Sequence, residues 1–232
     1  MSCDQSFSNF AIVVFEEKDG NFISVDRKVL HTGENVPSNL KKEFGQYFKT
    51  EQEQLQYLYS QFKPFYLKHD PNYLVFEGLA FGAKGDRVFS LGGLYYHITT
   101  SLLEDGILNP QQLKKVTPTS VKKIARDCLK EEDRYEKDKN GNVIYNKNNK
   151  PRLNTMPKKF VVEALLNTKD AWLVDGYTTS SNKKETGKHD IPDAFFIGKA
   201  FIETLRVDDI QEDSKKNNKK ESKISKKKIN KT

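Results

Sequence analysis

The sequence is poor in the features that mark several large classes of protein. Its 232 residues include two cysteines, Cys3 and Cys128, which are too few for a disulfide framework or a zinc site. No run approaches the roughly 20 apolar residues of a membrane span. The opening residues, Met1 to Asp4, show no basic segment ahead of an apolar one, as a secretory signal would. We therefore predict a protein of a reducing, cytoplasm-like compartment, neither secreted nor bound to a membrane.

Positive charge is concentrated at one end of the chain, although the formal net charge is +7. Residues 214–232 hold nine lysines and one glutamate, so the rest of the chain carries a net charge of about −1. We predict one domain over residues 1–207 and a disordered lysine-rich tail over 208–232. The tail is either a solubilising appendage or a nonspecific DNA tether that salt would weaken.

The apolar pattern predicts a mixed α/β domain. Residues 11–15 form a strand, and Asp19-Gly20 marks a hairpin to a second strand at 21–25, so the chain begins as an antiparallel meander. A helix over 50–68, with Thr50 as its N-cap and Glu53 completing a capping box, precedes a buried strand at 73–77, an order typical of a sheet with parallel members. The other predicted elements are strands at 28–30 and 112–116 and helices at 86–105, 120–125, 157–166 and from 189 onward.

A strongly polar segment interrupts this pattern over residues 127–156. Within it, Asn140-Gly141 is a hairpin signal. We predict that the segment is a protruding hairpin or a flexible insertion.

Four acidic residues fall at the ends of the predicted elements. Glu77 closes a buried strand, where an unpaired carboxylate is costly, and Asp4 follows a short first strand. Asp190 and Asp193 open the last helix and share one of its faces. Each has an ordinary alternative: Glu77 as the first solvated residue of its strand, Asp4 as a turn cap, and the two aspartates as partners of the helix dipole. As a set, they are of the type that holds two Mg²⁺ ions about 4 Å apart in two-metal nucleases.

Four segments, in order, resemble the motifs of the RuvC-type Holliday-junction resolvases, a branch of the RNase H-like nuclease fold. They are residues 4–11, 75–78, 116–123 and 189–194. The resemblance implies an RNase H-like mixed sheet, with an antiparallel N-terminal meander and parallel strands, flanked by helices. It also implies a magnesium-dependent endonuclease that resolves branched DNA by paired cuts. Such an enzyme would act as a homodimer, with residues 86–105 as the subunit interface.

The resemblance implies a metal-binding role for the acids. Asp4, Glu77, Asp190 and Asp193 would bind two Mg²⁺ ions, for which Mn²⁺ would substitute. His189 would replace or assist one of these ligands, although a lone histidine is more often structural or simply exposed.

The resemblance implies DNA contacts as well. Lys122 or Lys123 would contact phosphate near the scissile bond, and Phe81 would stack on a base at the branch point unless it is tucked into the core. The family has a glycine-rich, lysine-containing segment soon after the position of Lys123. This sequence lacks that segment, and Lys158 and Lys159 are the substitutes for its DNA-contacting lysine.

Three other functions are alternatives to a junction resolvase. A nuclease acting on flaps or RNA–DNA hybrids has the same metal chemistry and differs only in substrate shape. A junction-binding protein that does not cleave would lack one of the carboxylates, and all four are present. An RNase H-like ATPase needs glycine-rich phosphate loops, of which the glycines at 78, 82 and 85 are only a faint match.

Overall fold

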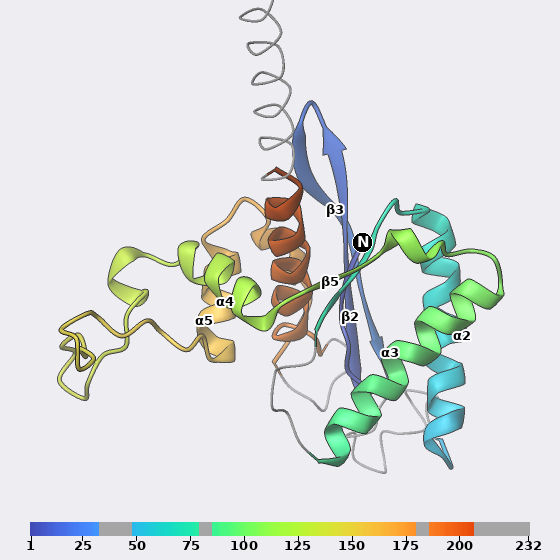
Figure 1. Ribbon diagram of the computed structural model, residues 1–232, viewed down its shortest axis with the longest axis horizontal. Coiled ribbons are helices and arrows are strands. Elements are labelled where there is room, and N and C mark those ends of the chain that lie inside the picture. Colours follow the sequence, from blue (N-terminus) through green and yellow to red (C-terminus); the bar gives the residue numbers. More distant parts are fainter. Residues whose placement is uncertain (33–47, 79–84, 180–185, 207–232) are drawn as a thin grey trace, which may run out of the picture.

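A mixed β-sheet forms the centre of the protein, which was analysed as a computed structural model (Figure 1). The structure describes residues 1–32, 48–78, 85–179 and 186–206. The sheet has five strands in the order β3-β2-β1-β4-β5. Strand β1 is antiparallel to β2 but parallel to β4, and β4 is parallel to β5, which confirms the predicted mixed sheet. The strands are β1 (Ser2–Asp4), β2 (Asn9–Lys18), β3 (Asn21–His31), β4 (Leu74–Glu77) and β5 (Leu113–Val116).

Strand β3 is continuous, and the prediction of two short strands at 21–25 and 28–30 was wrong in this respect. The charged residues Asp26, Arg27 and Lys28 interrupt the apolar pattern, yet they pair with β2 like their neighbours. The charged side chains are partly buried and have partners there, because Asp26 pairs with Lys68 and Arg27 stacks on Trp172.

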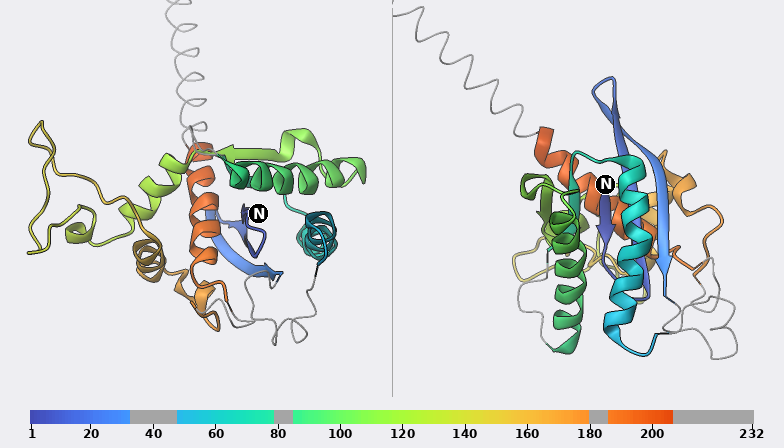
Figure 2. Two further views of the ribbon diagram at one scale, coloured as in Figure 1. Left: turned by 90° about the horizontal axis from the view of Figure 1, so that it is seen from below. Right: turned by 90° about the vertical axis from the view of Figure 1, so that its right-hand side faces the viewer.

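Helices cover both faces of the sheet (Figures 1 and 2). The pair α2 and α3 lies on one face, while α4, α5 and the C-terminal helix lie on the other. Within the described ranges, none of the helices has the length and apolarity needed to cross a membrane. The helices are α2 (Glu51–His69), α3 (Asp86–Glu104), α4 (Pro118–Asp127), α5 (Lys158–Leu166) and the described part of the C-terminal helix, 190–206.

Local signals set the starts of two helices. Thr50 caps α2, as predicted, by accepting a hydrogen bond from the Glu53 backbone N–H. The Glu53 carboxylate, however, accepts from the N–H of Lys49 at 2.7 Å, so the predicted capping box is incomplete. Helix α4 starts at Pro118, two residues before the predicted start, because the Thr117 hydroxyl caps it and proline suits the first helical position.

Alternation along the strands decides which side chains face which helices. In β2, Phe10, Ile12 and Val14 pack toward α2 and α3, whereas Ala11 and Val13 pack toward the C-terminal helix. By the same period of two, Cys3 in β1 joins the first cluster. The side chains at the alternate positions of β1 and β4 therefore face the C-terminal helix.

A glycine lets the C-terminal helix approach β1 closely. A Cβ atom at Gly198 would lie 2.7 Å from Ser2 Oγ and would also overlap the Phe15 ring. The Ser2 hydroxyl donates a hydrogen bond to the Ala194 carbonyl at 2.7 Å. These contacts fix the first turns of the helix against the start of β1.

Three predictions fall wholly or partly outside the described residues. They concern Phe81, the tail over 208–232 and the domain boundary at 207. The polar segment 127–156 is described, and most of it forms an arm that projects beyond α4 and α5 (Figures 1 and 2).

Candidate functional site

Two of the predicted acids meet at the ends of adjacent strands. Parallel β1 and β4 pair Ser2 with Val75 and Cys3 with Phe76. The next residues along the two strands are Asp4 and Glu77, which therefore lie side by side at the carboxyl ends of neighbouring parallel strands. Both side chains take the face opposite to Cys3 and Phe76 and are partly buried.

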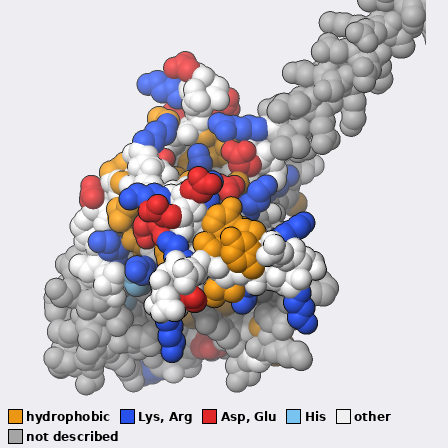
Figure 3. Space-filling view, turned by 90° about the vertical axis from the view of Figure 1, so that its left-hand side faces the viewer, with side chains coloured by type: hydrophobic (Ala, Val, Ile, Leu, Met, Phe, Trp, Pro, Cys, Tyr) orange, Lys and Arg blue, Asp and Glu red, His pale blue; other side chains and the backbone are white. Residues whose placement is uncertain are grey.

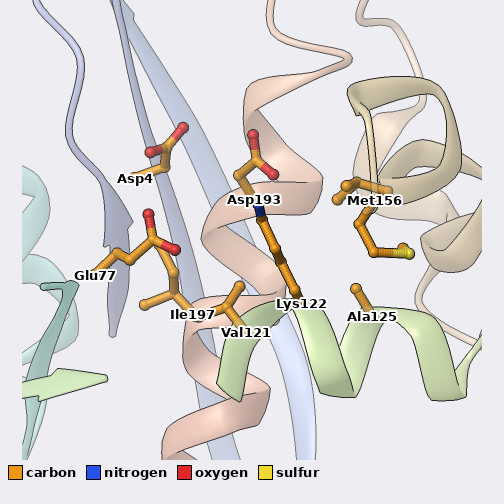
Figure 4. Close-up of a pocket in the computed structure, with 9 residues that line it drawn as sticks. Asp4, Glu77, Val121, Lys122, Ala125, Met156, Asp193 and Ile197 are labelled. Carbon is orange, nitrogen blue, oxygen red and sulfur yellow. The ribbon is translucent and has the colours of Figure 1, made fainter. Parts of the chain in front are cut away.

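The C-terminal helix brings the third acid to the same place. Asp193 lies in its first turn, where Pro192 is also tolerated because the first turn needs no N–H donor there. Asp4, Glu77 and Asp193 line one pocket of about 140 Å³, and Figure 4 shows their carboxylates around a common space. The other lining residues are Val121, Lys122, Ala125, Met156, Val161 and Ile197.

The three carboxyl groups destabilise one another's charged forms. Burial raises the pKa of Asp4 well above its usual range, and the negative charges of Asp193, Asp190 and Glu77 raise it further. Burial raises the pKa of Asp193 to about 7, with Asp190 and Glu77 adding to the effect against the opposing charges of Lys158 and Lys122. Burial also raises the pKa of Glu77, which Lys122 opposes. The pocket is a concentration of negative charge that favours bound protons or a cation.

One lysine of each predicted pair faces this site. Both Lys122 and Lys123 are exposed, but only Lys122 belongs to the pocket lining. Lys158 Nζ lies 3.4 Å from Asp190 Oδ1. Lys159 is exposed, with its ammonium 5.7 Å from the centre of the Phe160 ring.

The remaining predicted residues lie beside the pocket rather than in its lining. Asp190 is 8 % exposed and pairs with Lys158. His189 is partly exposed and precedes the helix by one residue. The structure thus brings together Asp4, Glu77 and Asp193, and Asp190 lies close enough for its charge to raise the pKa of Asp4 and Asp193.

His31 is a neighbour of the site that the sequence analysis missed. Its Nδ1 lies 2.7 Å from Asn9 Oδ1 and 2.9 Å from the Ser8 carbonyl. Burial lowers the pKa of His31, against the opposing effects of that carbonyl and of the Asp190 charge. The only available signal was a histidine at the end of the hairpin's second strand, opposite the polar turn that follows Asp4.

The donor set is suited to a hard divalent cation. Among the residues that the structure describes, no group of three or more His, Cys, Asp or Glu side chains has the arrangement of a metal site. The carboxylates around the pocket nevertheless supply only oxygen ligands, which Mg²⁺ prefers. Their mutual repulsion is also what a cation between them would relieve. The residues therefore fit a hard divalent cation by donor type and by charge.

Comparisons with known proteins give a fold. No protein-family model matches the sequence, and no curated protein matches it. Among solved structures, Thermus thermophilus RuvC in complex with a Holliday junction substrate matches with a TM-score of 0.51 and 10 % identity, over 89 % of this chain and 94 % of that one. A second Thermus thermophilus RuvC structure matches with a TM-score of 0.50 and 12 % identity over the same shares. At such identities the likeness speaks for the fold alone, and the chain has the RuvC-like form of the RNase H-like α/β fold.

Proposed function

We propose that this protein is a magnesium-dependent endonuclease that cuts branched DNA, with the four-way junction as its substrate and paired nicks as its product, in a reducing, cytoplasm-like compartment. One observation carries the proposal. Asp4, Glu77 and Asp193, which are far apart in the sequence, line one pocket at the carboxyl ends of parallel strands in a fold shared with RuvC.

The acids and lysines have separate roles in the proposed reaction. Asp4, Glu77 and Asp193, with Asp190 beside them, would hold two Mg²⁺ ions, for which Mn²⁺ would substitute. When bound, these ions supply Lewis-acid stabilisation of the phosphodiester and an activated water. Lys122 brings a positive charge to the pocket lining, where it attracts the phosphate.

Other side chains organise this centre. Lys158 holds the Asp190 carboxylate at 3.4 Å and offsets part of the negative charge on Asp4 and Asp193. Ala125 and Met156 form an apolar part of the pocket wall beside the carboxylates.

The exposed lysines extend the site toward DNA. Lys123 and Lys159 lie next to Lys122 and Lys158 in the chain and are exposed, so they can contact neighbouring phosphates. Phe81 stays a prediction for stacking at the branch point, and His189 stays a prediction for assisting the metal ligands.

The proposed enzyme is a homodimer that uses α3 as its interface. Phe89 is 81 % exposed and Tyr96 is 64 % exposed, and their spacing of seven puts them on one face of the helix. Gly92 lies between them, and a Cβ there would meet no atom within 4 Å. An exposed apolar stripe with a glycine at its middle suits close packing against a second copy, and a twofold dimer matches the near-twofold symmetry of a junction.

The test is cleavage of a mobile four-way junction in Mg²⁺, compared for the wild type, Glu77→Gln and the control Glu203→Gln. Glu203 is on the C-terminal helix, forms an ion pair with Arg206 and does not line the pocket. We expect paired symmetric nicks from the wild type and the control, and none from Glu77→Gln.

Other substrates in the same assay decide the substrate claim. Linear duplex, a flap and an RNA–DNA hybrid serve as competitors. Faster cutting of the flap or hybrid would refute the junction as substrate and keep the metal site. Junction binding without cleavage by the wild type in any divalent metal would refute the catalytic assignment.

A further inference from the structure

The polar segment after α4 forms an ordered arm, defined here as residues 134–154. Three short backbone stretches lie against one another in it, with antiparallel bridges that join Tyr135 to Leu153, Lys137 to Val143 and Tyr145 to Pro151. The hydrogen bonds from Ile144 N to the Glu136 carbonyl and from Arg152 N to the Ile144 carbonyl connect all three stretches. The segment predicted as a protruding hairpin or a flexible insertion thus includes an arm of three backbone stretches.

The arm is held in shape by its own turns, and the same turn is built twice. Asp138 accepts hydrogen bonds from the N–H groups of Asn140 and Asn142 at 2.8 and 2.9 Å. Eight residues later, Asn146 accepts from Asn148 and Lys150 at 2.9 and 3.1 Å. The residue three positions after each acceptor, Gly141 or Asn149, has a positive φ, which glycine and asparagine tolerate best.

The base of the arm is fixed to the wall of the candidate site. Arg126 in α4 donates two hydrogen bonds to the Asn154 carbonyl at 3.0 and 2.8 Å. The Asn154 side chain is buried, donates to the Asp133 carbonyl and accepts from the N–H of Met156. Since Met156 lines the pocket, the arm begins at the site and extends away from it.

The outer part of the arm is rich in unpaired positive charge. Residues 137–152 contain five lysines and arginines and one acidic residue. Lys137 and Arg152 form ion pairs with acids nearer the base. Lys139, Lys147 and Lys150 are exposed and have no ion pair among the described residues. Figure 3, which views the side on which the arm projects, shows lysine and arginine side chains interspersed with acidic ones over this face.

We propose that the arm contacts the phosphate backbone of a duplex segment of the substrate, away from the phosphate that is cut. Lysines in a fixed arrangement, with the exposed Tyr145 among them, are suited to phosphates and sugars. A protein partner fits less well, because lysine is depleted at protein interfaces. The contact adds affinity and orientation rather than chemistry. This inference rests on the proposed function, because it assigns a further part of the same DNA substrate.

Charge-neutral variants test the arm. The triple variant Lys139→Gln, Lys147→Gln, Lys150→Gln is compared with the wild type by fluorescence anisotropy on a four-way junction. EDTA prevents cleavage, and salt is varied. The control triple variant replaces three exposed lysines that lie outside the arm: Lys18→Gln, Lys49→Gln and Lys68→Gln. Lys18 is in β2, Lys68 is in α2, and Lys49 lies just before the start of α2.

The salt dependence gives the expected result. Each neutralised phosphate contributes about 0.9 to the slope of log affinity against log salt concentration. Loss of three contacts therefore reduces the slope by about 2 to 3, and it raises the Kd at physiological salt by roughly tenfold or more. The lysine-rich tail is present in all three proteins, so the difference isolates the arm. An unchanged slope, or an equal change in the control, would overturn the proposal.

Junctions with shortened duplex arms locate the contact. We expect the wild type and the arm variant to bind a short-armed junction equally, and a difference that persists there would overturn a duplex contact. The outcome is separable from the proposed function, because these measurements need no cleavage. A wild type that binds with the expected slope but never cuts would refute the nuclease and leave the arm contact standing.

Discussion

Replacing Asp193 with asparagine should stabilise the metal-free protein at pH 8 and leave its stability at low pH unchanged. Folding raises the pKa of Asp193 from 3.8 to about 7 because the carboxyl group is buried among other acids. The folded state therefore holds this proton more tightly than the unfolded state does. The contribution of Asp193 to stability is fully present below pH 3.8 and is lost as the pH rises toward 7. Asparagine does not ionise and avoids this loss.

The size of the effect follows from the same pKa. Each unit of difference between the folded and unfolded pKa values is worth about 1.4 kcal/mol. The cost of ionised Asp193 at pH 8 therefore has an upper limit of about 4 kcal/mol. Asp193 lines a pocket that admits water, which screens the charge, and we expect about half of that limit, or ~2 kcal/mol. For a chain of this length, 1 kcal/mol shifts the Tm by about 2–4 °C. The variant should therefore melt about 4–8 °C higher at pH 8 in EDTA.

Thermal unfolding in EDTA between pH 4 and 8 measures this difference, with Glu203→Gln as the control on the same helix. Adding Mg²⁺ at pH 8 should raise the Tm of the wild type through binding to the folded state and raise that of Asp193→Asn much less. A variant less stable than the wild type at pH 8, or a difference independent of pH, would refute the assignment of Asp193 to a cluster of repelling acids.

Three further predictions concern activity, packing and assembly. Glu77→Gln should lower the rate of junction cleavage by about 100-fold or more, since even residues that only support metal ligands are worth about 10–100-fold; near-normal cleavage at saturating Mg²⁺ would exclude Glu77 as a ligand. Gly198→Ala should lower the free energy of unfolding by about 1–3 kcal/mol, because its Cβ would overlap Phe15. The matched helical change Gly93→Ala has open space around the new Cβ and should be neutral or stabilising by up to about 1 kcal/mol. Equal denaturation midpoints for the two variants would contradict this packing. Phe89→Glu should convert a dimer to a monomer in sedimentation velocity while the melting temperature stays within a few degrees, and an unchanged sedimentation coefficient would remove α3 from the interface.

The local chemistry of the chain was sufficient to predict its elements and the ends of its strands. A continuous apolar run at 11–15 identified β2, and Thr50 identified the start of α2, because such runs and caps depend on neighbours within a few positions. For the same reason, Asp4 and Glu77 could be recognised as acids at strand ends. The RuvC-like fold could be predicted because the four motifs occur in the expected order, and the structural comparison confirms it.

Tertiary packing decided which of these residues meet. The pairing of Cys3 with Phe76 places two acids side by side, and close approach at Gly198 brings in Asp193 from nearly 190 residues away in the sequence. Local periodicity predicts that one face of a strand or helix is buried, but it does not predict which element covers that face. The sequence therefore could not decide that Lys122 rather than Lys123 lines the pocket, or that Asp190 pairs with Lys158. The ordered arm belongs to this group, because its polar residues carry no apolar pattern and its shape comes from side chains that bond to backbone N–H groups.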